Sequence, residues 1–95
     1  MSDIVSAAVD ALKEKVQGGF DGIAKFVIEG EGALIIDSDG VRAGDDDAEV
    51  TLTAEADTFQ AILEGDMDPT SAFMSGKLSV DGDMGLAMKL ASALA

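Results

Sequence analysis

Residues 48–83, AEVTLTAEADTFQAILEGDMDPTSAFMSGKLSVDGD, decide the fold because the period of their apolar residues changes twice. Polar and apolar residues alternate over 49–54, which predicts a strand with one buried face. A helical period follows over 57–65, and a second, shorter helix is expected over 70–75. Alternation returns over 78–80. This stretch therefore predicts the order strand, helix, helix, strand.

Residues that favour helix ends divide the same stretch. Asp57 is a good N-cap with Gln60 three residues later, which is the spacing of a capping box. Gly65 supplies a left-handed stop after the first helix. Asp68 and Pro69 predict the start of the second helix, since Asp caps and Pro suits the first helical position.

The sequence before residue 48 predicts one helix and three strands. A helical period over 4–16 ends at Gly18, and strands are expected over 20–28, 33–37 and 41–43. Short turns rich in Asp and Gly separate these strands. Together with the strand over 49–54 they predict an antiparallel meander with one solvent-exposed face.

The last helix, over residues 84–95, has an unusually wide apolar surface. Its polar residues fall on one narrow arc: Gly85, Lys89 and Ser92. Leu86, Leu90 and Leu94 form one apolar edge, and Met84, Ala87, Met88 and Ala91 form the other. A helix on the outside of a small domain needs an apolar stripe of only ~100°. We therefore expect the leucine edge to anchor the helix and the methionine edge to face something other than the sheet.

Composition limits the chemistry that the chain can perform. The 95 residues predict one domain over 1–95, and 47% of them are hydrophobic, enough for a core. Cys and His are both absent, which excludes thiolate metal sites and the nucleophile–histidine arrangements of many hydrolases. We therefore expect no enzymatic activity and no cofactor.

Two acidic segments resemble the start of a calcium-binding loop. They begin at Asp37 and Asp45, but neither has Gly at the sixth position of the loop or Glu at the twelfth. Carboxylates in solvated turns explain these segments better. The sequence therefore predicts no metal site.

The balance of charge excludes several partners. There are 19 acidic and 6 basic residues, for a net charge of −13. Nucleic acid is an improbable partner, since binding phosphates needs clustered Lys and Arg. No run approaches the ~20 apolar residues that span a bilayer, so stable membrane insertion is not expected. The first 15 residues lack the features of a signal peptide, and a cytoplasmic location is expected.

An ordered set of residues in the second half resembles the sterol carrier protein-2 family, in particular its stand-alone bacterial members. The set comprises Asp57-Thr58-Phe59, Ile62, Gly65, Asp68-Pro69, Ala72-Phe73-Met74, Gly76-Lys77-Leu78, Val80 and Gly82-Asp83, followed by the apolar helix. The resemblance implies an α+β fold with a five-stranded, mostly antiparallel sheet. It also implies that helices pack on one face of the sheet and enclose an apolar tunnel.

The resemblance further implies a function and a set of ligand-binding residues. Members of the family bind sterols, fatty acids or acyl-CoAs without catalysis. Carried onto this sequence, the lining of the tunnel is Phe59, Ile62, Leu63, Phe73, Met74, Met84, Met88 and Leu90. Methionine is common on surfaces that adapt to irregular apolar partners, although Met and Leu at helical spacing also form ordinary core.

Two other functions fit the residues. In the first, the chain is a small acidic module that binds a basic protein. In the second, it is an accessory that presents substrate to a lipid-handling enzyme.

Overall fold

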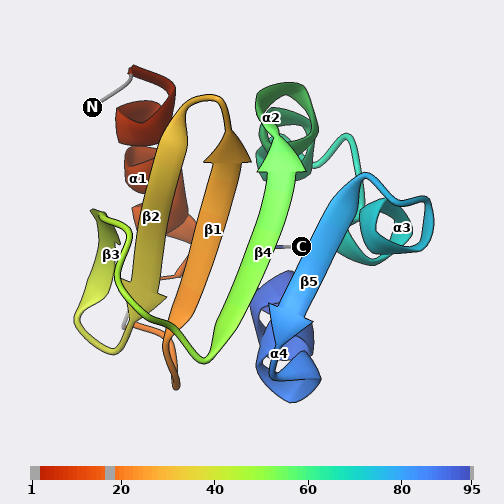
Figure 1. Cartoon of the computed structure of the whole chain (residues 1–95). Helices are drawn as coiled ribbons and strands as arrows, with labels where there is room; N and C mark the ends of the chain where they lie inside the picture. The colour runs from red at the N-terminus through yellow and green to blue at the C-terminus, as the bar shows by residue number, and fades with distance from the viewer. Residues whose placement is uncertain (1–2, 17–18, 95) are drawn as a thin grey trace.

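The computed structural model describes residues 3–16 and 19–94 and contains one five-stranded sheet and four helices (Figure 1). The predicted helix stop at Gly18 lies outside the described residues. The strands are β1 (Ala24–Glu29), β2 (Gly32–Asp37), β3 (Gly40–Ala43), β4 (Val50–Glu55) and β5 (Leu78–Gly82). The helices are α1 (Asp3–Lys15), α2 (Ala56–Leu63), α3 (Pro69–Met74) and α4 (Met84–Leu94).

The strand order β3-β2-β1-β4-β5 confirms a five-stranded, mostly antiparallel sheet and corrects one part of the expected topology. β1 pairs with β2, β2 with β3, and β4 with β5, all antiparallel. However, β4 lies beside β1 and parallel to it, with Ala24 opposite Val50 and Glu29 opposite Glu55. The prediction of a four-strand meander was therefore wrong. A meander would leave β4 at an edge beside β3, whereas here β4 is interior.

The connection between β3 and β4, residues 44–49, crosses the outer face of β2 and β1 to make this parallel pairing. Gly44 N donates to the Ala33 carbonyl oxygen at 3.1 Å, and Lys25 Nζ lies 2.9 Å from Asp45 Oδ1. Ile35, on the face that the sequence predicted to be exposed, is fully buried near Gly44. The crossing segment thus covers part of the outer face of the sheet.

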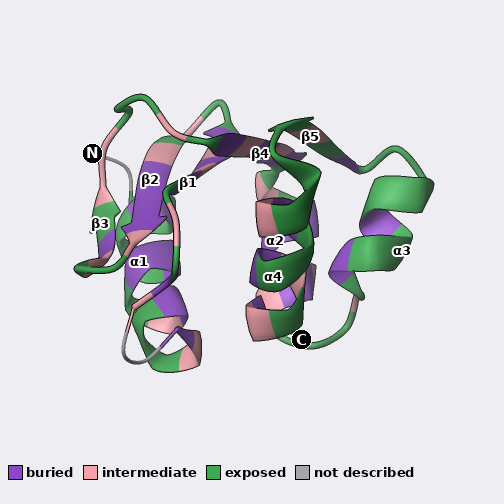
Figure 2. Cartoon of the chain, turned by 90° about the horizontal axis from the view of Figure 1, so that it is seen from below, coloured by how far each residue is buried: buried purple, intermediate pink, exposed green. Residues whose placement is uncertain are grey.

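All four helices lie on the other face of the sheet, as expected, and the buried residues face inward between the two layers (Figure 2). One hydrophobic cluster connects residues from every strand and every helix. Phe26 of β1 and Phe59 of α2 meet in this core, with ring centroids 4.2 Å apart and planes tilted by 54°. Such tilted aromatic pairs add to the stabilisation from buried area.

The helix starts agree with the sequence in two cases and differ in a third. Asp68 accepts a hydrogen bond from Thr70 N at 3.4 Å, and Asp83 accepts one from Leu86 N at 3.2 Å, so both cap their helices. The capping box expected at Asp57 is wrong, because the N-cap of α2 is Glu55, two residues before Asp57. Strand β4 runs into α2 without a linker, which puts the cap position on the last residue of the strand.

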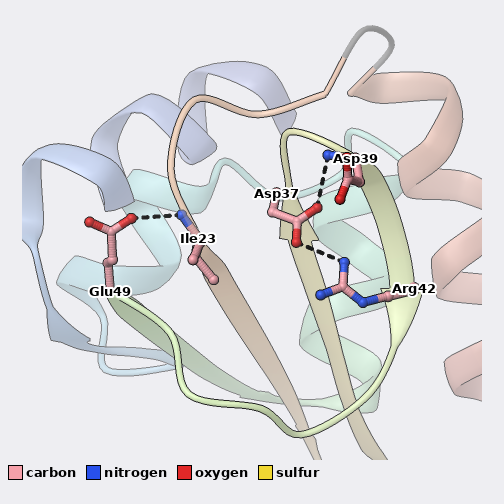
Figure 3. A network of polar contacts seen from close by, with 5 residues as sticks. All are labelled: Ile23, Asp37, Asp39, Arg42 and Glu49. Atoms are coloured by element: carbon pink, nitrogen blue, oxygen red, sulfur yellow. Dashed lines mark hydrogen bonds and ion pairs between the residues drawn. The ribbon is translucent and has the colours of Figure 1, made fainter.

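A carboxylate organises the turn between β2 and β3 (Figure 3). Asp37 Oδ1 accepts from Asp39 N at 2.9 Å, and Asp37 Oδ2 accepts from Arg42 Nη1 at 2.7 Å. The hydrogen bond from the Arg42 guanidinium holds the pKa of Asp37 below its usual value of 3.8. A carboxyl group with a lowered pKa in the folded state stabilises the fold only while it is ionised.

Replacing Asp37 with Asn tests this role. The folded-state pKa lies below the unfolded one, so the ionised group stabilises the fold at neutral pH, and this contribution disappears as the pH falls through the folded pKa. We expect Asp37→Asn to melt at a lower temperature than the parent at pH 7. The difference between the two melting temperatures should shrink as the pH falls below 3.8, the usual pKa of the carboxyl group. An equal difference at pH 7 and pH 2.5, measured by circular dichroism, would contradict this prediction.

Gly82 marks a close approach of two backbone segments at the end of β5. It has φ of +112°, and a Cβ atom there would overlap the Glu49 carbonyl oxygen. Gly76 also has a positive φ, +81°, but a Cβ there meets no atom within 4 Å. A side chain at Gly76 would therefore cause backbone strain alone, whereas one at Gly82 would cause both strain and steric overlap.

We expect Gly76→Ala to lower the free energy of unfolding by about 1–2 kcal/mol, the cost of a left-handed residue with a side chain. Gly82→Ala should cost about 3 kcal/mol or more, because the Glu49 backbone must also move. Urea denaturation of both variants measures the difference. Equal losses would show that β4 and β5 separate freely at this end.

Candidate functional site

An apolar groove of about 260 Å³ lies between α3 and α4, beneath β4 and β5. Its lining residues are Leu52, Pro69, Thr70, Phe73, Met74, Leu78, Val80, Met84, Ala87, Met88 and Ala91. Thr70 is the one polar member of this set. The arrangement offers an apolar ligand a sheet floor and two helical walls.

Strands β4 and β5 supply the floor of the groove. Leu52 and Val80 are directly paired in the antiparallel register, and Leu78 pairs with Ala54. Side chains alternate between the two faces of a strand, so these positions point toward the helices. The floor follows directly from the alternation in the sequence.

Helix α3 forms one wall. Asp68 caps it and Pro69 is its first residue, which fixes where the short helix begins. Pro69 and Ala72 are buried, whereas Phe73 and Met74 are exposed by 43% and 81%. The helix thus packs through its small residues and leaves its two large apolar side chains at the groove.

Helix α4 forms the other wall, and the predicted division into two apolar edges holds in part: Leu86 on the leucine edge is only half-buried, and Ala87 on the methionine edge is buried. Leu90 and Leu94 are buried, whereas Met84 and Met88 are exposed by 47% and 69% and line the groove. The methionine edge is therefore the side of α4 that is available to a ligand.

The side of α4 away from the groove contacts the segment before β1. A Cβ atom at Gly22 would lie only 2.8 Å from Leu86 Cδ2, and Lys89 Nζ lies 3.6 Å from Asp21 Oδ2. These contacts pack this side of α4 against residues 21 and 22.

The exposure of large apolar side chains is concentrated at this groove. Among the residues that the structure describes, the exposed large hydrophobic residues are Ile4, Ile23, Phe73, Met74, Met84 and Met88. Four of these six line the groove. Contiguous exposed apolar surface marks an interaction site far more specifically than single exposed residues do.

The structure brings together half of the eight residues that the resemblance implied for ligand binding. Phe73, Met74, Met84 and Met88 line the groove. The other four do not: Phe59, Ile62 and Leu90 are at most 2% exposed in the core, and Leu63 packs against it.

Phe59 and Leu63 instead border a second apolar hollow. It lies between α1 and α2 and is also about 260 Å³, with Ile4, Ala7 and Ala11 on its α1 side. No described residue belongs to the linings of both the groove and this hollow. The described residues therefore form open hollows on the helical side, and the enclosed tunnel that the resemblance implied is not seen.

The lining also includes residues absent from the expected set: Leu52, Pro69, Thr70, Leu78, Val80, Ala87 and Ala91. Strand alternation already placed Leu52, Leu78 and Val80 on the inner face. Ala87 and Ala91 lie on the methionine edge of the last helix. A lining built from strand floor plus methionine edge would have found these five.

Metal-binding clusters and membrane-spanning helices are both absent from the part of the chain that the structure describes. Within residues 3–16 and 19–94, acidic side chains do not converge in a group of three or more suited to hold a metal ion. In the same ranges, every helix is too short or too polar to cross a membrane.

Comparisons with known proteins point to one family. The chain matches the SCP-2 sterol transfer family over residues 5–95. It is 36% identical over 98 residues to hydroxysteroid dehydrogenase-like protein 2 of Xenopus laevis, covering 95% of this chain and 24% of that protein. It is 42% identical over 66 residues to sterol carrier protein 2 of Rattus norvegicus, covering 70% of this chain and 11% of that protein. The chain thus spans a quarter or less of these relatives.

A solved structure agrees in fold. Sterol carrier protein 2 of Aedes aegypti, determined in solution in complex with palmitate, superposes with a TM-score of 0.79 at 25% identity. The superposition covers 100% of this chain and 97% of that one.

Charge substitutions on α4 test the difference between its two edges. Leu90→Glu buries a carboxylate in the core and should lower the free energy of unfolding by about 4 kcal/mol or more. Met88→Glu places the carboxylate at an exposed position and should change it by about 0.5 kcal/mol or less. Thermal melts followed by circular dichroism compare the two variants. Similar losses at both positions would mean that the methionine edge is packed rather than open.

Proposed function

Because this chain belongs to the SCP-2 sterol transfer family, we propose that it binds an apolar lipid in the groove between α3 and α4. The gathering of Phe73, Met74, Met84 and Met88 around one groove carries this proposal. A relative in Aedes aegypti was solved with palmitate, which supports a lipid as the ligand. The resemblance to the family leaves three classes of apolar lipid as candidates: sterols, fatty acids and acyl-CoAs.

The size and lining of the groove suit a lipid that displaces mobile side chains. Its volume of about 260 Å³ lies just below the ~300 Å³ at which ligand sites usually begin. Methionine has three rotatable bonds and a polarisable sulfur, so it repacks around ligands of different shape at low cost. Rotation of Met74 and Met88, the most exposed lining residues, enlarges the groove without moving the backbone.

We also propose that binding occurs without catalysis. The chain has no His and no Cys, and the groove is lined by apolar residues and Thr70. General acid–base catalysis needs a titratable group within hydrogen-bond reach of the reacting atom. The lining supplies none.

The expectations of a single domain over 1–95 and of a cytoplasmic location stay predictions.

A second candidate is presentation of lipid to an enzyme. The matching region is about a quarter of a relative named hydroxysteroid dehydrogenase-like protein 2, so the family domain accompanies other sequence there. A carrier speeds lipid transfer between donor and acceptor vesicles in proportion to its concentration. A presenting accessory leaves that rate unchanged and lowers the KM of an enzyme for its lipid substrate. The two measurements separate the candidates.

A matched pair of neutral substitutions on α4 tests the site. Met88→Gln keeps the length of the side chain but places an amide against the ligand, at a cost of ~1–3 kcal/mol. We expect the affinity for hexadecanol and cholesterol to fall about 5- to 100-fold. Displacement of a fluorescent neutral lipid measures the affinity.

Ser92→Gln is the control, because Ser92 is exposed on the same helix and does not line the groove. Its affinity should match that of the parent. Equal affinities for both variants and the parent would place the lipid elsewhere in the chain.

A further inference from the structure

None of the six basic residues of the chain lines the groove. They are Lys13, Lys15, Lys25, Arg42, Lys77 and Lys89. Three of them form ion pairs: Lys25 with Asp45, Arg42 with Asp37, and Lys89 with Asp21. A negatively charged headgroup in the groove therefore has no cation among the lining residues to pair with.

The three remaining lysines are also placed elsewhere. Lys13 and Lys15 belong to the last turn of α1. Lys77 borders a different, polar surface pocket, together with Glu29, Glu55 and Asp57. An anion beside Lys77 would therefore lie outside the groove and near three carboxylates.

The positive ends of the two helices that form the groove are also occupied. Asp68 accepts a hydrogen bond from Thr70 N at the start of α3, and Asp83 accepts one from Leu86 N at the start of α4. Each carboxylate takes a backbone donor that an anionic headgroup would use, and adds a negative charge beside a lining residue, Pro69 or Met84. Both helix starts therefore repel an anion.

We propose that the groove selects lipids by the charge of the headgroup. At equal chain length it takes an uncharged or positively charged headgroup and disfavours a carboxylate. This inference rests on the proposed function and adds the class of ligand to it. A carboxylate inside the groove loses water without gaining a cation from the lining, and one beside Pro69 or Met84 meets the neighbouring carboxylate of Asp68 or Asp83 on a chain of net charge −13.

A series of ligands with one chain length tests this selectivity on the full chain. Hexadecanol, hexadecylamine and palmitate compete for the groove against a fluorescent neutral lipid at pH 8.5 and low salt. We expect the alcohol and the amine to bind about tenfold more tightly than palmitate, or better. Raising the salt concentration should reduce the difference, because screening shortens the range of the repulsion.

The outcomes separate the two proposals. Palmitate binding as tightly as the alcohol overturns the selectivity and leaves the lipid-binding groove intact. Failure of all three ligands to bind overturns the proposed function itself.

A pair of double variants tests the role of the two capping aspartates. Asp68→Asn with Asp83→Asn removes two charges beside the groove, and Asn caps helices as well as Asp does. The control, Asp10→Asn with Glu14→Gln, removes two charges from exposed positions on α1. We expect palmitate to gain about fivefold or more in affinity in the first variant and about twofold or less in the second. Equal gains would assign the discrimination to net charge and overturn the role of the caps.

Discussion

Six residue pairs, from Ala24–Val50 to Glu29–Glu55, join β1 and β4 in parallel at the centre of the sheet. Parallel neighbours require the chain to return to the end from which it started, so the segment 44–49 must cross the sheet. That crossing buries Ile35 and brings Glu49 to Ile23, where Ile23 N donates to Glu49 Oε1 at 3.0 Å (Figure 3). The outer face, the position of β4 and the edge position of β5 all depend on this one pairing.

The groove is a consequence of what then covers β4 and β5. Helices α2 and α3 connect these two strands, and α4 follows β5 directly, so α3 and α4 both pack against β5. α3 is six residues long and buries only Pro69 and Ala72. Such a helix is too short to fill the space beside α4. The apolar floor at Leu52 and Val80 is therefore covered by two separated helices, with a groove between them, and not by a continuous layer of helices.

Local patterns predicted the elements well, because alternation, helical period and caps depend on neighbouring residues alone. Asp68 and Asp83 cap as expected, and on the last helix Leu90 and Leu94 are buried while Met84 and Met88 are exposed, as expected. The parallel pairing was missed because β4 alternates in the same way whether its neighbour is β1 or β3. Alternation specifies which side chains point inward, and it carries no information about which strand lies beside them.

The same distinction explains the outcome for the candidate site. On α2 the apolar stripe faces the Phe26 ring and α1, so Phe59 and Ile62 are core. Their spacing in the sequence is no different from that of a pocket lining. On α4 the width of the apolar surface exceeded what packing needs, and this excess identified Met84 and Met88 as available. The width of the apolar surface on a helix thus indicates which residues are open to a ligand, whereas the spacing of apolar residues does not.

The excess of acid and the open groove form a consistent pair. An exposed apolar groove invites association with a second copy, and the four large side chains around it would be buried by such a contact. Each copy carries −13, and screening at ~0.15 M salt leaves repulsion effective only within ~8 Å. Asp68 and Asp83 start the two helices that wall the groove, so contact between two grooves would bring like charges together, whereas an uncharged lipid entering the groove meets no such opposition. The charge therefore disfavours self-association while leaving the apolar surface open to a neutral ligand.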